Sequence, residues 1–211
     1  MQKRLAVVAL SVLATGVLAA QTPMPASPQG KAQVQVGGKY VKADEGQRYE
    51  GGKWIEITYG RPILRGRANI FGSGADYGKA IRDDAPVWRA GANVSTRLRT
   101  EAPLVIGGKT VAPGEYSVFI DLKENSWTFI VSSWAAQQKY DPKDKTALWG
   151  AYEYTPDKDV VRAPMKLMKS TVSVEQLTWG FVNVTADGSG ELAIWWDKEF
   201  ATVPFKLGMG S

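Results

Sequence analysis

The chain of 211 residues contains no histidine and no cysteine. These absences exclude a Ser-His-Asp triad, a thiolate nucleophile, disulfides and a His-based metal site. The formal net charge of +5 is too small to indicate nucleic-acid binding, which needs a concentrated basic surface. Any acid–base catalysis would use carboxylates, Lys or Tyr. We therefore expect no cofactor, no metal and no nucleic-acid partner.

The first 20 residues have the layout of a signal peptide. Lys3 and Arg4 form a short basic start, residues 5–18 are apolar or small, and Ala19 and Ala20 provide a cleavage point. The apolar run of about 15 residues is shorter than the roughly 20 that span a bilayer. We expect cleavage near these alanines, export to the periplasm or beyond, and no membrane-spanning segment.

Residues 21–38 consist mostly of Pro, Gln, Gly and Ala, with few large apolar side chains. This composition is typical of a flexible leader. A single β domain is then expected over residues 39–207, followed by a tail over 208–211. The roughly 190 residues left after cleavage are enough to form one hydrophobic core.

The rest of the chain consists of short β-branched and aromatic runs, with almost no helical periodicity. Residues 54–59 (WIEITY) alternate and place Ile55, Ile57 and Tyr59 on one face. Three further pairs of runs flank turn residues and predict hairpins: 104–106 with 109–111, 116–122 with 127–131, and 177–185 with 191–196.

The last run, residues 200–207, contains Pro204, which cannot donate to a strand ladder. This strand is therefore expected at a sheet edge or at the start of a new pairing. Nine or ten short strands predict an all-β, mainly antiparallel fold. We favour a β-sandwich, with barrel-like closure as the alternative.

Three segments fit neither a strand nor an ordinary loop: 59–67 (YGRPILRGR), 87–98 (VWRAGANVSTRL) and 148–154 (LWGAYEY). Together with 112–119 (APGEYSVF) and 127–130 (WTFI), they resemble a bacterial domain-of-unknown-function family, number 2911. The resemblance covers nearly all of the chain after the leader. It implies an exported, mostly β domain and brings no established activity, so the function must be argued from a site.

Arginines and aromatic rings in these segments are the candidate ligand-binding residues. Forked guanidinium groups suit carboxylate, phosphate or sulfate, and exposed aromatic rings stack on sugars. The residues are Arg61, Arg65, Trp88, Arg89, Asn93, Trp149 and Tyr152. The alternative is that each arginine pairs with a local carboxylate or caps a backbone carbonyl, and that most of the rings are structural.

Acidic residues give no specific signal for catalysis or for metal binding. Lysines within residues 141–145 (DPKDK) and 157–159 (DKD) would repel calcium, so both stretches are interpreted as solvated loops. No two carboxylates are singled out as the pair that glycoside hydrolysis requires. We therefore predict no catalytic residues and no metal ligands.

Three functional hypotheses remain, and the first is favoured. It is a non-catalytic domain that binds an envelope glycan or a small anionic molecule. The second is a hydrolase that uses a carboxylate pair on saccharides. The third is a structural or interaction protein of the cell envelope, which meets a protein partner through an apolar patch or an uncovered edge strand such as residues 200–207.

Overall fold

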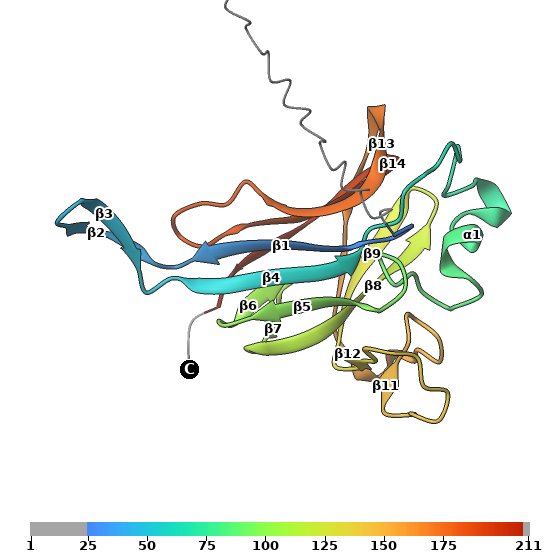
Figure 1. The fold of residues 1–211 in the computed structure, drawn as a ribbon, viewed down its shortest axis with the longest axis horizontal. Helices are drawn as coiled ribbons and strands as arrows, with labels where there is room; N and C mark the ends of the chain where they lie inside the picture. The colour runs from blue at the N-terminus through green and yellow to red at the C-terminus, as the bar shows by residue number, and fades with distance from the viewer. Residues whose placement is uncertain (1–24, 209–211) are drawn as a thin grey trace, which may run out of the picture.

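A computed structural model describes residues 25–208; the expected signal peptide over residues 1–20 lies outside the described residues. The described chain forms two main antiparallel sheets (Figure 1). The larger contains six strands in the order β1 (Gln29–Val36), β4 (Lys53–Gly60), β5 (Thr96–Thr100), β8 (Gly114–Lys123), β9 (Ser126–Ser132) and β12 (Asp159–Pro164). The smaller contains β13 (Lys166–Val182), β14 (Gly190–Leu207), β6 (Leu104–Ile106) and β7 (Lys109–Val111).

The remaining elements are short and lie at the two ends of the sandwich. The hairpin of β2 (Lys39–Ala43) and β3 (Gly46–Glu50) projects from one end. The other end carries η1 (Gly74–Asp76), α1 (Lys79–Arg82), η2 (Pro156–Lys158) and the parallel pair β10 (Ala135–Ala136) and β11 (Ala147–Leu148). Within residues 25–208, no helix is long and apolar enough to cross a membrane.

The core lies between the two sheets and follows from the alternation of each strand. Ile55 and Ile57 of β4 are fully buried, whereas Trp54 on the opposite face is exposed. From the other sheet, Trp179 of β13 meets Phe129 of β9 edge to face, with 6.2 Å between ring centroids. These contacts confirm the all-β sandwich, and the sheets do not close into a barrel.

The three predicted hairpins are present, and Gly107 and Gly108 adopt the positive φ that their turn requires. Residues 200–207 continue β14 and are not a sheet edge, because β14 lies between β13 and β6. β14 pairs with β13 as far as Thr202 and with β6 from Phe205, so Pro204 marks the start of a new pairing.

The expectation of a flexible leader through residue 38 is wrong for Gln29–Val36. These residues form β1, which pairs with β4 over its whole length and forms one edge of the larger sheet. Ala32 and Val34 pack against the core, and Val36 is buried in it. These apolar residues recur with the period of two of a strand, but the glutamines and glycines around them made the composition resemble a leader.

Candidate functional site

Two irregular segments, residues 87–95 and 147–155, cover the outer face of β8 and β9. Phe119 and Ile130 lie opposite each other on that face and are fully buried. Tyr154 packs on Phe119 edge to face, with 5.0 Å between ring centroids. Both segments contribute to this second apolar cluster, which therefore holds them against the sheet.

The 87–95 segment is a loop inserted into the line of β5. Trp88 and Ile120 exchange backbone hydrogen bonds of 2.8 and 2.9 Å, and Thr96 of β5 lies opposite Val118 two residues earlier on β8. Both ends of the loop are thus paired with β8, at Ile120 and at Val118, and the residues between Trp88 and Thr96 protrude from this strand. The Ser95 hydroxyl ties this loop to the second segment by donating to the carbonyl oxygen of Leu148, 3.3 Å away.

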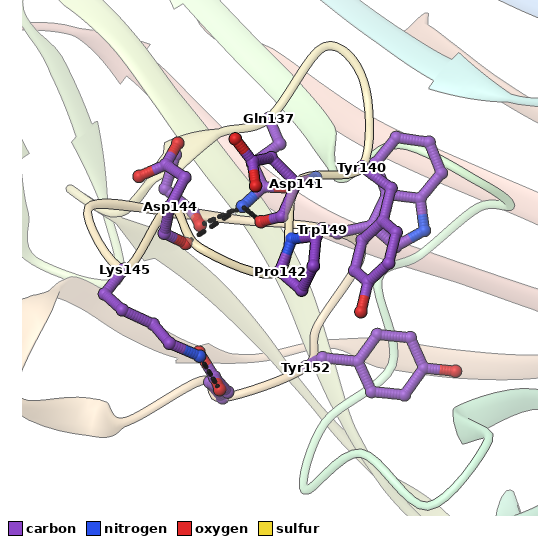
Figure 2. Close-up of a pocket in the computed structure, with 10 residues that line it drawn as sticks. Gln137, Tyr140, Asp141, Pro142, Asp144, Lys145, Trp149 and Tyr152 are labelled. Atoms are coloured by element: carbon purple, nitrogen blue, oxygen red, sulfur yellow. Dashed lines mark hydrogen bonds and ion pairs between the residues drawn. The ribbon is translucent and has the colours of Figure 1, made fainter.

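A surface pocket of about 550 Å³ lies beside these two segments, over residues 137–153. Figure 2 shows Tyr140, Trp149 and Tyr152 along one side of the pocket, with Asp144 and Lys145 on the other. The Tyr140 and Trp149 rings lie 6.1 Å apart at 58° to each other. Tyr140 is 58% exposed and Tyr152 37% exposed, so their faces are available to a ligand.

Gln137 organises the loop that forms the polar half of this pocket. Its buried amide nitrogen donates to the carbonyl oxygens of Asp141, Asp144 and Ala147, at 3.0 to 3.1 Å. Its amide oxygen accepts the Asp141 N–H at 3.0 Å. One side chain thus replaces the backbone ladder that residues 137–147 lack.

Arg89 supports Tyr152 from behind the pocket. Its guanidinium carbon lies 5.4 Å from the centroid of the Tyr152 ring, and Nη1 donates to the Asn93 carbonyl oxygen at 3.0 Å. The Tyr152 hydroxyl donates to the Asp83 carboxylate. That hydrogen bond, reinforced by burial, raises the pKa of Tyr152, so the phenol stays neutral and its ring orientation is fixed.

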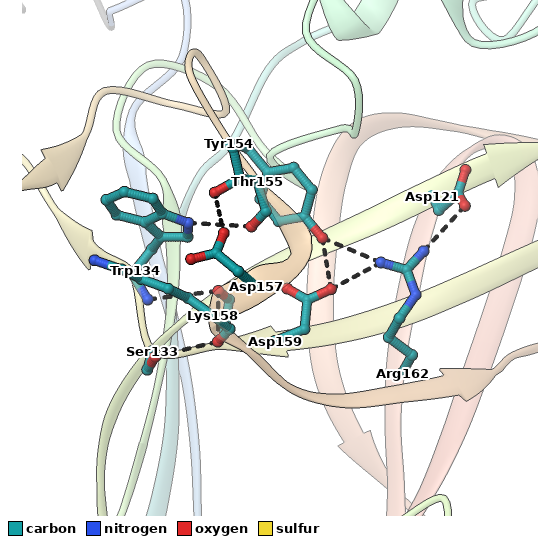
Figure 3. A network of polar contacts seen from close by, with 10 residues as sticks. Asp121, Ser133, Trp134, Tyr154, Thr155, Asp157, Lys158, Asp159 and Arg162 are labelled. Carbon is teal, nitrogen blue, oxygen red and sulfur yellow. Dashed lines mark hydrogen bonds and ion pairs between the residues drawn. The ribbon is translucent and has the colours of Figure 1, made fainter.

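A second network holds the end of the 147–155 segment to β12 (Figure 3). The Tyr154 hydroxyl donates to Asp159 at 2.6 Å, and Arg162 donates to Asp159 at 2.8 Å and to Asp121 at 3.1 Å. Burial and the Asp159 hydrogen bond raise the pKa of Tyr154 well above its usual range. Tyr154 therefore points inward and anchors the segment, while Tyr152 points outward.

Two acidic groups of the pocket are engaged by neighbouring side chains. Hydrogen bonds from the side chain and backbone of Thr146 lower the pKa of Asp144, which keeps this carboxylate ionised. Glu153 forms an ion pair with Lys145, with 2.6 Å between Oε1 and Nζ. A general acid needs a raised pKa, whereas the pKa of Asp144 is lowered. Among residues 25–208, no group of three or more acidic side chains is placed to hold a metal ion.

The residues that the sequence selected separate into two groups. Trp149 and Tyr152 line the same pocket, and Arg89 contacts the Tyr152 ring without lining the pocket itself. Trp88 does not join them, because it is 1% exposed and stacks on Trp196 in the core, with 6.2 Å between ring centroids. Trp88 cannot serve as a surface platform.

Arg61, Arg65 and Asn93 also lie away from the pocket. Arg61 Nε donates to the Leu177 carbonyl oxygen at 3.2 Å, so it caps a backbone carbonyl, as the alternative interpretation expected. Arg65 is exposed beside Glu175, whose carboxylate accepts the Arg65 backbone N–H at 2.8 Å. Asn93 lines a neighbouring cavity of about 320 Å³, and its side-chain amide donates to the Ser27 carbonyl oxygen at 3.4 Å.

Several pocket residues were not selected from the sequence. Asp141, Asp144 and Lys145 belong to residues 141–145, which were interpreted as a solvated loop, and Tyr140 directly precedes them. The sequence of this loop is dominated by charged residues, which are typical of solvated loops. Nothing in the sequence shows that the buried side-chain amide of Gln137 holds the loop in place. The nearby Trp149 and Tyr152 were the cues that aromatic residues gather here.

The fold and the pocket define an antiparallel β-sandwich with an aromatic-lined surface site. A family model described as "Protein of unknown function (DUF2911)" matches residues 41–205. The chain belongs to this family, and the match includes all three irregular segments but not β1. No curated protein and no solved structure matches the chain.

Proposed function

We propose that this protein is a non-catalytic binding domain that takes a neutral glycan in the pocket over residues 137–153. The observation that carries the proposal is the grouping of Tyr140, Trp149 and Tyr152 around one side of that pocket. Aromatic faces stack on the apolar faces of sugar rings, while amide and carboxylate oxygens accept hydrogen bonds from the sugar hydroxyls. The pocket volume of about 550 Å³ is within the usual range for small-molecule sites.

The charges of the pocket favour a neutral ligand over an anionic one. Asp141, Asp144 and Glu153 line it against one basic residue, Lys145, which is already paired with Glu153. An anion would therefore meet excess negative charge. Arg89, which contacts the pocket residue Tyr152, also donates to the Asn93 carbonyl oxygen.

The carboxylates of the pocket support binding rather than catalysis. The Asp144 and Glu153 carboxylates can accept hydrogen bonds from sugar hydroxyls. The lowered pKa of Asp144 disfavours the protonated carboxyl that glycoside hydrolysis requires. We further propose that the domain acts outside the cytoplasm on envelope saccharides. This part of the proposal depends on residues 1–20, whose sequence has the signal-peptide layout.

A glycan array tests the proposal with the full chain. Neutral and acidic oligosaccharides are printed together and probed with wild type, Trp149→Ala and Trp54→Ala. Trp54 is an exposed tryptophan on β4 that does not line the pocket, so it is the matched control. The expected result is binding to neutral glycans that Trp149→Ala removes and Trp54→Ala preserves. Binding only to acidic glycans, or binding that survives Trp149→Ala, would contradict the proposal.

A further inference from the structure

A second cavity, of about 320 Å³, lies where the 87–95 segment meets the ends of β1, β4 and β5. We call it the polar cavity, because each of these elements contributes a polar side chain to its lining: Gln29, Thr58, Asn93 and Arg97. Among the described residues that line it, Arg97 is the one that carries a charge. The polar cavity therefore differs in chemistry from the pocket beside it, which aromatic and acidic side chains line.

The guanidinium group of Arg97 has donors to spare. Within residues 25–208 its side chain, 20% exposed, forms an ion pair with Glu115 at 3.5 Å and no hydrogen bond. A guanidinium offers five N–H donors, and polar groups shielded from water are normally hydrogen-bonded. Gln29 and Asn93 are exposed, and within the described part of the chain neither side-chain amide oxygen accepts a hydrogen bond. The cavity therefore presents donors and acceptors together.

The polar cavity adjoins the aromatic pocket, the name used from here for the pocket over residues 137–153. Gln138 lines the polar cavity and also a cavity of about 430 Å³, which shares Tyr140 with the aromatic pocket. Gln138, Tyr140 and the lysine between them are exposed. Beneath this surface, the Ser95 hydroxyl of the polar cavity lies within hydrogen-bonding distance of the carbonyl oxygens of both residues that flank Trp149. The three cavities therefore follow one another along one surface.

We infer that the polar cavity is a second subsite of the glycan site, so that this protein binds an oligosaccharide chain rather than a single sugar. This extension rests on the proposed function, because the aromatic pocket is where the first sugar stacks. A hydroxyl group both donates and accepts hydrogen bonds. Arg97 would donate to the hydroxyl oxygens of a later sugar, while the amide oxygens of Gln29 and Asn93 accept its hydroxyl hydrogens. Glu115 offsets the charge of Arg97, which suits a neutral chain.

The dependence of affinity on chain length tests the second subsite. The full chain is titrated calorimetrically with cello-oligosaccharides, malto-oligosaccharides and N-acetylglucosamine oligomers of one to six units, all of which are neutral. In a series that binds, affinity should rise by about tenfold or more with chain length and become constant once both cavities are filled. Affinity that does not rise with length would overturn the inference and leave the proposed function intact. No binding at any length in any series would contradict both.

Two arginines of β5 provide a matched pair of variants. Arg97 and Arg99 lie on the same face of the strand, and each forms an ion pair of 3.5 Å, but only Arg97 lines the polar cavity. Arg97→Gln should remove the gain in affinity that longer chains bring. It should leave binding of the shortest bound oligosaccharide unchanged, which also shows that the variant folds. Arg99→Gln should keep the dependence on length seen in wild type.

Two further variants assign the two ends of the site. Gln29→Ala changes an exposed side chain of the polar cavity and should reduce the gain from longer chains by a smaller factor than Arg97→Gln. Trp149→Ala removes a stacking surface and should weaken binding at every length. An equal loss for short and long chains in Arg97→Gln, or an undiminished gain in both Arg97→Gln and Gln29→Ala, would refute the second subsite.

Discussion

The guanidinium group of Arg89 lies over the ring of Tyr152, with 5.4 Å between the guanidinium carbon and the ring centroid. This contact joins two segments that are 63 positions apart in the printed sequence. The arginine side chain is 11% exposed, and its ion pair with Asp83 is long, at 3.8 Å. Arg89 is therefore a positioning residue for the pocket, and its contacts with the protein account for its location.

Removing the Arg89 side chain should destabilise the domain as well as weaken ligand binding. Arg89→Ala leaves the Asn93 carbonyl oxygen and the Tyr152 ring without their partner, which we expect to lower the free energy of unfolding by about 1 to 3 kcal/mol. Urea unfolding measures the change. Arg99→Ala, which removes an exposed ion pair of 3.5 Å with Glu101, should change stability by less than about 1 kcal/mol. Equal stability of the two variants would contradict the account.

Gly150 should not tolerate a side chain, because it allows Arg89 to approach the 147–155 segment. Its φ is +66°, and a Cβ at this position would lie 2.7 Å from the Arg89 guanidinium carbon. Gly51→Ala is the matched control, since Gly51 has a φ of +73° but nothing within 4 Å. We expect the left-handed backbone to cost about 1 to 2 kcal/mol in both variants. Thermal unfolding should show a larger loss for Gly150→Ala, and a loss no larger than that of Gly51→Ala would argue against the close packing.

Gln137 should be required for the order of the pocket loop but not for the sandwich. Gln137→Glu replaces the amide donor by a carboxylate oxygen that faces three carbonyl oxygens, so residues 137–147 should lose their shared partner. Hydrogen exchange should show lost protection confined to that loop. Gln138→Glu changes the exposed neighbour, whose amide makes one contact of 3.5 Å, and should preserve protection. An identical exchange pattern in both variants would contradict the role of Gln137.

Stability should fall in alkali because of a buried phenol. Burial, chiefly, raises the pKa of Tyr77 from 10.0 to about 12. As the pH rises, the phenol of the unfolded chain therefore loses its proton before that of the folded protein. The neutral Tyr77 phenol contributes about 2 to 3 kcal/mol to the free energy of unfolding below about pH 10, and this contribution is lost as the pH rises toward about 12. The measurement is urea unfolding at about pH 9 and pH 12.

Tyr77→Phe is the control for that pH dependence. It should already be less stable at neutral pH, because Trp127 Nε1 donates to the Tyr77 hydroxyl at 2.9 Å and would lose its acceptor. Its stability should then fall less steeply between about pH 10 and pH 12. A steeper fall in the variant than in wild type would show that other groups dominate alkaline unfolding.

The strands could be predicted because their signal is local. In residues 54–59 the alternation of Ile55 and Ile57 with polar neighbours reports directly on one buried face. The bulge at Asp197 could not be predicted, since it arises from the pairing of two long strands and leaves no local mark. Pro204 did indicate the change of partner in β14.

The site was predicted only in part, because its residues meet through long-range packing. Trp149 and Tyr152 were identifiable from their irregular segment, whereas Trp88 looked equivalent to them and is buried. The difference is that the backbone of Trp88 pairs with Ile120, which a sequence does not reveal. The importance of Gln137 likewise depends on three carbonyl oxygens that only the folded loop brings together.

The most direct test of the central claim, that the aromatic pocket binds a neutral glycan, compares thermal unfolding of wild type and Tyr140→Ala with neutral oligosaccharides. Tyr140 is 58% exposed, so the variant should fold normally, and Tyr40→Ala, at 70% exposure in the distant hairpin, is its control. A saccharide at 100 times its dissociation constant should raise the unfolding midpoint by roughly 5 to 10 °C. The account predicts this shift in wild type and Tyr40→Ala and its loss in Tyr140→Ala. A shift of equal size in all three proteins, or no shift with any neutral glycan, would contradict it.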